Sequence, residues 1–152
     1  MTTVNHTYAA AIEWTGERRG RMTSPDLPDL EVAAPPEFQG HAGVWTPEHL
    51  FVAAVESCFM TTFLAIAELS KLEFAAFEAH AVGLLEKVEG KGLQMTEVVL
   101  RPRLTLRREE DVERALRILD KAERNCLISN SVTSRVVLEP VVTAEPAAIA
   151  VG

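Results

Sequence analysis

Residues 46–72 have the sequence TPEHLFVAAVESCFMTTFLAIAELSKL, and the interpretation of the rest of the chain depends on this stretch. It opens with a strong helix start, because Thr46 can cap, Pro47 suits the first helical position and Glu48 faces the positive end of the helix dipole. The residues that follow are apolar nearly all round, which is typical of a buried helix. The pattern therefore predicts a central helix over residues 47–72, with Cys58 in its middle.

This helix presents two apolar sides. One stripe, at spacings of three and four, contains Phe51, Val55, Cys58, Thr62 and Ala65; the opposite side carries Val52, Phe59, Phe63 and Ile66. Phe51, Phe59 and Phe63 could line a pocket, but packing in the core is the favoured interpretation. One chain of 152 residues cannot comfortably cover such a helix, so we expect an obligate homodimer.

The chain before the helix favours strands and turns. Residues 7–14 favour a strand, and residues 15–21 form a turn into a second strand, with Gly16 and Gly20 supplying the positive φ angles of tight turns. Residues 24–46 are rich in proline and glycine. They should be irregular, apart from short extended pieces such as Leu30–Ala33.

The chain after the helix alternates strand and helix. Residues 73–88 and 95–107 should form a hairpin around Gly90-Lys91-Gly92, with Pro102 at an edge or a bulge. Residues 109–125 form an amphipathic helix, and Cys126 follows it directly. Residues 135–142 favour a last strand. We expect an α/β fold of the α+β kind, with one domain over residues 1–142 and a mobile tail over residues 143–152.

Composition narrows the classes of function. The net charge of −7 argues against a nucleic-acid partner. No run of roughly 18 apolar residues is evident, so we expect no membrane-spanning segment, and the first residues lack a signal-peptide pattern. A cytoplasmic location is therefore expected. The four histidines show no metal-ligand spacing, and no nucleotide-binding loop occurs, so we expect neither a metal site nor a bound cofactor.

The chain has two cysteines, Cys58 and Cys126. In a reducing cytosol such a pair is rarely a structural disulfide, and from count alone both could be inert, buried thiols. Burial in an apolar helix raises a thiol pKa, so a reactive Cys58 would require a cation from another segment. The candidate cations are Arg18, Arg19 and Arg21. Glu48 lies about 15 Å along the helix from Cys58 and could hold such an arginine.

Three segments, in order and spacing, resemble signatures of the OsmC/Ohr family. The first is Thr46-Pro47-Glu48 followed by Cys58 in an alanine-rich apolar helix. The second is AERNCLISNSV, which places Cys126 after an amphipathic helix and before a Ser/Asn-rich stretch. The third is TGERRGRMTSPD, which resembles a glycine-flanked arginine turn with Arg18 at the position of the essential arginine. The match spans most of residues 8–138.

The resemblance implies a highly curved antiparallel sheet with two central helices, in an intertwined homodimer with sites at the interface. It implies reduction of organic hydroperoxides by a low-pKa cysteine, followed by a disulfide that a small or lipoyl-type dithiol reduces. On this basis Cys58 is peroxidatic and Cys126 resolving. Arg18 stabilises the thiolate and orients the peroxide, and Glu48 holds Arg18.

The chain departs from the family pattern at two places. Cys126-Leu127 stands where Cys-Pro is common, and Gly16-Glu17-Arg18-Arg19 stands where Gly-Gly-Arg is usual. Arg19 is thus an alternative to Arg18, and the Ohr, OsmC and less studied OsmC-like branches all stay open. Two other functions also stay open: a non-catalytic dimer that binds a small apolar or lipid-like ligand, and a stress-induced structural protein with no site.

Overall fold

The computed structural model describes residues 5–146 of the chain. The chain divides into two compact units, Met1–Leu50 and Phe51–Gly152. The sequence-based expectation was a single domain over residues 1–142. The division falls inside the first turns of the long helix.

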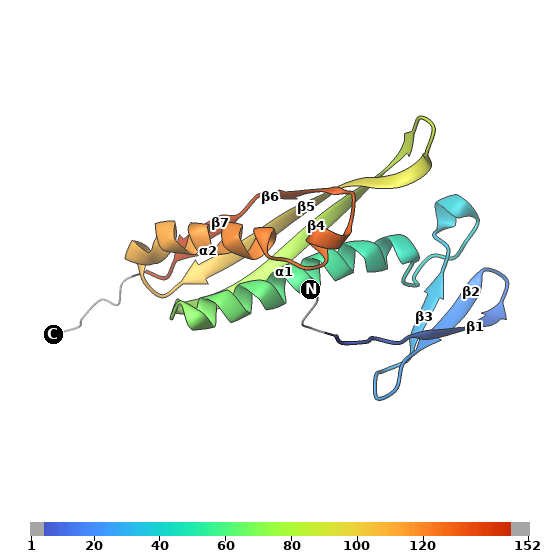
Figure 1. The fold of residues 1–152 in the computed structure, drawn as a ribbon, viewed down its shortest axis with the longest axis horizontal. Helices are drawn as coiled ribbons and strands as arrows, with labels where there is room; N and C mark the ends of the chain where they lie inside the picture. Colours follow the sequence, from blue (N-terminus) through green and yellow to red (C-terminus); the bar gives the residue numbers. More distant parts are fainter. Residues whose placement is uncertain (1–4, 147–152) are drawn as a thin grey trace. The chain divides into compact units, whose positions relative to one another are not determined.

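The first unit is built on a small antiparallel sheet. Its strands are β1 (Ala11–Gly16), β2 (Arg19–Thr23) and β3 (Leu30–Ala33), in that order across the sheet (Figure 1). The strand β3 coincides with the extended piece expected from the sequence. Outside β3, residues 24–46 contain only a single 3₁₀ turn, η1 (Pro36–Phe38), and the isolated bridge Val32–Trp45, which fits their proline content.

The turn between β1 and β2 is shorter than expected. Gly16 and Glu17 have positive φ angles of 126° and 50°, so they make the turn, and β2 begins already at Arg19. The sequence suggested a positive φ at Gly20, but Gly20 does not have one. It lies within β2, where a Cβ would approach the Glu13 carbonyl oxygen to 3.1 Å, so glycine is needed for close packing instead.

The long helix α1 spans Pro47–Leu69. Thr46 caps it as expected, because its Oγ1 accepts a hydrogen bond of 3.1 Å from the backbone N–H of His49. The helix ends three residues earlier than the sequence suggested. Lys71 takes a left-handed conformation with φ 54°, and the N–H of Leu72 turns back to the Ala67 carbonyl at 2.9 Å, which closes the helix.

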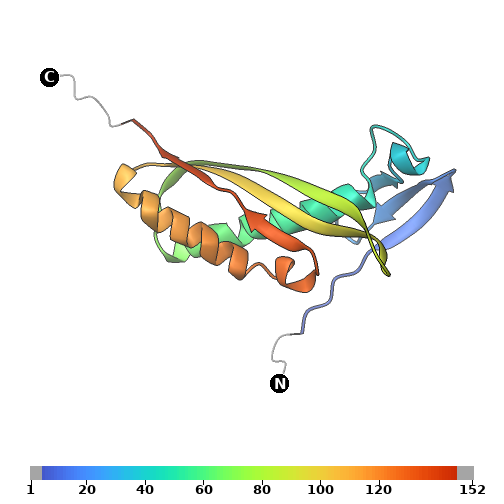
Figure 2. The ribbon, with the colours of Figure 1, turned by 90° about the horizontal axis from the view of Figure 1, so that it is seen from above.

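The second unit pairs α1 with a sheet and a second helix. The sheet contains the long hairpin β4 (Phe74–Val88) and β5 (Gly92–Leu106), and the short strands β6 (Arg135–Leu138) and β7 (Val141–Ala144). Between β5 and β6 the chain forms η2 (Glu109–Asp111), α2 (Val112–Arg124) and η3 (Ser129–Ser131). Both long helices lie on one face of this sheet (Figure 2), so the expected mixed α/β class is confirmed.

The sheet is mixed rather than wholly antiparallel, which corrects one expectation. The strands β6 and β7 pair one after the other along β5, and both run parallel to it. This arrangement also explains Pro102, which was expected at an edge or a bulge but lies buried in the central strand. Pro102 falls between the part of β5 paired with β6 and the part paired with β7, where the missing N–H breaks no ladder on that side.

The C-terminal end of the fold extends further than expected. The single strand expected at residues 135–142 is divided into β6 and β7 by Glu139 and Pro140. Thr143, placed at the start of a mobile tail, pairs with Thr105 of β5 instead. Residues 147–152 of that tail lie outside the described residues.

The core of the second unit lies between the helices and the sheet. Phe63 of α1 stacks on Phe77 of β4 with ring centroids 5.1 Å apart, and it contacts Phe74 at 5.6 Å. Phe59 lies 6.4 Å from Phe77. Phe59 and Phe63 are fully buried, so core packing was the correct interpretation for both. Other buried members of this core are Val55, Ala67, Val98, Leu100, Leu104, Leu106, Ala115, Ile118, Leu119 and Ala122.

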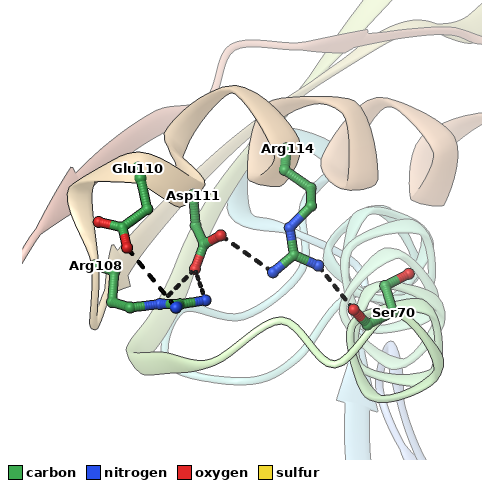
Figure 3. A network of polar contacts seen from close by, with 5 residues as sticks. All are labelled: Ser70, Arg108, Glu110, Asp111 and Arg114. Carbon is green, nitrogen blue, oxygen red and sulfur yellow. Dashed lines mark hydrogen bonds and ion pairs between the residues drawn. The ribbon is translucent and has the colours of Figure 1, made fainter.

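A network of charged side chains joins the end of α1 to the start of α2 (Figure 3). Asp111 accepts hydrogen bonds from Arg108 at 3.0 Å and from Arg114 at 3.2 Å. Arg114 also donates to the Ser70 carbonyl at 2.7 Å. Burial opposes ionisation of Asp111, but the two guanidinium groups outweigh it and hold the pKa of this carboxyl below its usual value.

The expectation that no segment could span a membrane is wrong for α1. Judged by length and composition alone, this is the one helix among the described residues that could do so. The sequence test failed because Glu56 interrupts the apolar run without making the helix polar. A core helix has the same composition, and α1 contributes four buried side chains to the core of the second unit.

Removing the central aromatic stack should destabilise the protein strongly. We expect Phe63→Ala to lower the free energy of unfolding by about 3–5 kcal/mol, because it deletes a fully buried ring and leaves a cavity. The matched control is Glu113→Ala on α2, where the side chain is exposed and the change should stay within about 0.5 kcal/mol. Chemical denaturation measures both. Equal losses would show that the core is not where the structure places it.

Candidate active site

The rotation of α1 sets the direction of Cys58. Phe59 and Val55 face the core, and successive residues of a helix are about 100° apart. Cys58 therefore lies beside the core face and is half-buried. One turn further along, the Thr62 hydroxyl lies 3.9 Å from the Cys58 sulfur.

The end of α2 sets the position of Cys126. The helix finishes at Arg124, and Asn125 closes it with a side-chain hydrogen bond of 2.8 Å to the Lys121 carbonyl. Cys126 follows and is completely buried. Its sulfur lies 4.0 Å from the carbonyl oxygen of Val55, on the turn of α1 that precedes Cys58.

The two thiols are brought together, although 68 positions separate them in the sequence. Both cysteines are free, and each thiol shifts the pKa of the other: Cys126 lowers the pKa of Cys58, and Cys58 raises the pKa of Cys126. The predicted pair thus shares one site, formed by the middle of α1 and the segment that follows α2. A reduced pair of cysteines at one site can be oxidised to a disulfide and reduced again by thiol–disulfide exchange.

The segment after Cys126 is held by hydrogen bonds of its own. The Asn130 N–H donates to the Cys126 carbonyl at 3.0 Å, and the Asn130 side chain donates to the Arg124 carbonyl at 3.1 Å. The Ser131 hydroxyl donates to the Leu127 carbonyl at 2.7 Å. This folded segment includes Leu127 and Ile128, whose backbone N–H groups lower the pKa of Cys58.

The Cys58 thiol is acidified by its surroundings. Burial alone would raise its pKa, but four hydrogen bonds outweigh burial and lower the pKa below the usual thiol value. In decreasing order of effect, the donors are the Ile128 N–H, the Cys126 thiol, the Thr62 hydroxyl and the Leu127 N–H. The site therefore makes Cys58 easier to ionise than an ordinary thiol.

Cys126 shows the opposite behaviour. Burial raises the pKa of its thiol, and the neighbouring Cys58 raises it further, while Ser129 lowers it through its backbone N–H and its hydroxyl. The Ser129 hydroxyl is buried, and no hydrogen bond of ordinary geometry satisfies it among residues 5–146. The pair thus consists of a thiolate-forming cysteine and a neutral thiol that donates to it.

The remaining predicted site residues belong to the first unit. Arg18 donates to the Phe38 carbonyl at 2.8 Å and to the Gln39 side-chain oxygen at 3.3 Å, and forms no ion pair with a described residue. Arg19 is instead paired with Glu31 at 2.9 Å. The Glu48 Oε2 atom is buried and has no hydrogen-bond partner in the described part of the chain. The pairing of Arg18 with Glu48 stays a prediction.

Sequence reasoning missed the main-chain donors. It held that only a cation could make Cys58 reactive, whereas the groups that lower this pKa among residues 51–146 are neutral. Backbone N–H groups have no residue signature, so no side-chain pattern could reveal them. The available signal was position, because Leu127 and Ile128 directly follow the second cysteine outside any helix. Within the described residues no group of three or more potential metal ligands gathers.

Comparison with known proteins places this site in a family. The model of the family described as OsmC-like protein matches residues 40–141. The chain belongs to the OsmC-like protein family. The resemblance identified from the three sequence motifs is thereby confirmed.

Individual relatives agree over nearly the whole chain. An OsmC-like protein of unknown function from Vibrio cholerae has a TM-score of 0.83 and 25% identity, covering 90% of this chain and 100% of its own. The organic hydroperoxide resistance protein OsmC of Legionella pneumophila has a TM-score of 0.71 and 25% identity, with 91% and 99% covered. YmaD of Bacillus subtilis, an uncharacterised protein, is 25% identical over 140 residues, which are 89% of this chain and 92% of YmaD.

These similarities confirm the expected OsmC-like fold, with two main helices against antiparallel and mixed sheets. They also relate this OsmC-like protein to organic hydroperoxide resistance proteins.

The two thiols should differ sharply in reactivity. At neutral pH we expect iodoacetamide to modify Cys58 more than about tenfold faster than Cys126, because one pKa unit changes the thiolate fraction about tenfold below the pKa. The lowered pKa and partial exposure of Cys58 both act in this direction. Mass spectrometry of the two cysteine-containing peptides over time measures the rates. Faster modification of Cys126 would contradict the assignment.

Proposed function

We propose that this OsmC-like protein is a thiol-dependent peroxidase that reduces organic hydroperoxides. The observation that carries the proposal is the contact between an acidified Cys58 and a buried, neutral Cys126. A peroxidatic cysteine needs a thiolate that solvent can reach, and a resolving cysteine needs to lie close enough to form a disulfide.

In the first step, the Cys58 thiolate attacks the terminal oxygen of the hydroperoxide. A sulfur–oxygen bond forms as the oxygen–oxygen bond breaks, and the alkoxide leaves and takes up a proton to become the alcohol. Cys58 is oxidised to a sulfenic acid, and the peroxide is reduced by two electrons.

In the second step, Cys126 attacks the sulfenic sulfur. A disulfide forms, and the sulfenic hydroxyl leaves as water with the proton of the Cys126 thiol. The charge on Cys58 raises the pKa of Cys126 before the reaction. That charge disappears when Cys58 becomes a neutral sulfenic acid, so Cys126 becomes easier to deprotonate at the moment when it must attack.

We propose that an external small or lipoyl-type dithiol then reduces the disulfide by two exchange steps, with no bound cofactor or metal. On the resemblance, Arg18 stabilises the thiolate and orients the peroxide, and Glu48 holds Arg18. Two features of these residues support this assignment over Arg19. Arg18 binds only neutral oxygens, while the buried Glu48 carboxylate oxygen has an open acceptor position among the described residues.

We also propose a homodimer in the cytoplasm, with neither a nucleic-acid nor a membrane partner. The support for a second copy lies on α1, where Met60, Leu64 and Leu69 are 37%, 39% and 85% exposed. A helix that buries one apolar side in its own core and exposes another is suited to contact a partner. The acidic net charge of −7 supports the absence of a nucleic-acid partner.

Single-cysteine variants test the peroxidase proposal. We expect Cys58→Ser to abolish peroxide reduction, because the nucleophile is lost. Cys126→Ser should complete one peroxide-dependent turnover and stop with Cys58 as a sulfenic acid, which a dimedone-type probe labels. If Cys126→Ser prevents the first oxidation while Cys58→Ser preserves it, the two roles are reversed.

The unmodified chain provides the complementary measurement. One equivalent of an organic hydroperoxide should remove two thiols per chain. A protein that only binds an apolar ligand would keep both thiols.

The oligomeric state can be measured directly. We expect light scattering at micromolar concentration to give the mass of a homodimer, because a monomer would leave the exposed apolar side of α1 in water. Leu64→Glu, at a half-exposed position on that side, should shift the equilibrium toward monomer. The control is Glu113→Lys on the exposed side of α2. A monodisperse wild-type monomer would contradict the proposed assembly.

A further inference from the structure

The groups that lower the pKa of Cys58 carry no formal charge. Burial raises the pKa of Cys58. Among residues 51–146, two backbone N–H groups, a hydroxyl and a thiol lower it. Two of these four donors are consecutive main-chain groups, at Leu127 and Ile128. Successive N–H groups directed at one atom form a local concavity that binds anions.

These two N–H groups are not committed elsewhere. Within residues 5–146, neither donates a backbone hydrogen bond to a carbonyl, while the neighbouring N–H groups of Cys126 and Asn130 donate to Glu123 at 3.2 Å and to Cys126 at 3.0 Å. Leu127 is 66% exposed, so its side chain adds little to the packing of this segment. The contribution of Leu127 to the site is therefore its backbone.

The segment is also fixed at both ends. Cys126 is buried against the Val55 carbonyl, which anchors the start of the segment on α1. Further along, the Ser131 hydroxyl holds the Leu127 carbonyl at 2.7 Å, and Asn130 holds the Arg124 carbonyl. The Leu127 carbonyl shares its peptide plane with the Ile128 N–H, so the Ser131 contact fixes that donor. The Asn130 N–H donates to the Cys126 carbonyl at 3.0 Å and so fixes the plane that carries the Leu127 N–H.

We propose that residues 126–131 form a thiolate-binding loop, in which the main-chain N–H groups of Leu127 and Ile128 bind the charged sulfur of Cys58 and Ser131 is a positioning residue that orients them. The proposal deepens the proposed peroxidase function, on which its role in catalysis rests. It assigns two tasks to one segment, since the loop that supplies the resolving thiol also activates the thiol that attacks the peroxide.

The titratable groups around Cys58 are few. Cys126 acts on it directly through the thiol hydrogen bond. Glu56 on α1 and Glu123 on α2 are half-buried carboxyl groups whose own pKa values are raised by burial, and neither is among the described groups that shift Cys58. The pH dependence of Cys58 should therefore report mainly on the loop.

The first test uses the unmodified chain. The amide protons of Leu127 and Ile128 should shift in NMR spectra as pH rises, with the same midpoint as alkylation of Cys58, because they bind the thiolate as it forms. In Cys58→Ala these two shifts should disappear. Amide signals that do not follow the ionisation of Cys58 would overturn the proposal, whether or not any variant folds.

The second test compares variants by the pH profile of Cys58 alkylation, resolved by peptide mass. Leu127→Pro removes one donor, and Leu127→Ala keeps it. We expect proline to raise the midpoint by about one pH unit, which makes alkylation about tenfold slower below the midpoint, while alanine leaves the profile unchanged. Ser131→Ala should raise the midpoint by a smaller amount, because it releases the Leu127 carbonyl without removing a donor.

Arg18→Ala completes the comparison. A larger shift from Arg18→Ala than from Leu127→Pro would assign the thiolate to the arginine and overturn the role of the loop. Equal shifts from Leu127→Pro and Leu127→Ala would do the same, because both lose the leucine side chain and only one loses the N–H. Alkylation needs no peroxide, so an inactive protein with the expected profiles would refute the peroxidase function and leave the loop standing.

Discussion

The packing of α1 against the β4–β5 hairpin is the constraint on which the other features depend. The stack of Phe63 on Phe77 fixes the rotation of the helix about its own axis. With that rotation set, Cys58 has to face sideways from the core, toward the segment that follows α2. Gly83 of β4 permits this close approach, since a Cβ there would lie 2.5 Å from the Val52 side chain. The reactive sulfur thus takes its direction from aromatic residues that have no part in its chemistry.

The ionisation of Cys58 depends on a balance between burial, which raises its pKa, and hydrogen bonds, which lower it. A charge-assisted hydrogen bond contributes about 1.5–3 kcal/mol, which corresponds to roughly one to two pKa units. Burial of the half-exposed Cys58 thiol opposes ionisation, and its effect is larger than that of any single hydrogen bond at this sulfur. Several donors acting together are needed to lower the pKa, and they are supplied here by Thr62 on the same helix and by the loop after Cys126. An arginine would add to this balance without being its only source.

The parts of the fold that depend on local patterns could be predicted from the sequence. The parts that depend on pairing between distant segments could not. The Thr46 cap, the hairpin and the amphipathic α2 depend on neighbours within a few residues, so the sequence predicts them well. The parallel pairing of β6 and β7 joins segments far apart in the chain, and Pro102 was misplaced because its position in the sheet depends on that pairing. At the site, both cysteines carried a motif, whereas the donors of Leu127 and Ile128 are chemically the same in almost every residue type.

Because both ends of α2 are anchored on α1, the number of residues in α2 sets the position of Cys126 relative to Cys58. The first turn of α2 is fastened to the end of α1 through Asp111, Arg114 and Ser70, and its far end is fastened where Cys126 packs against the Val55 carbonyl. Adding or removing one residue between these anchors would move the second thiol by about 1.5 Å and turn it by about 100°. Exposed side chains along α2 can vary freely in this arrangement, while the number of residues between Asp111 and Cys126 cannot.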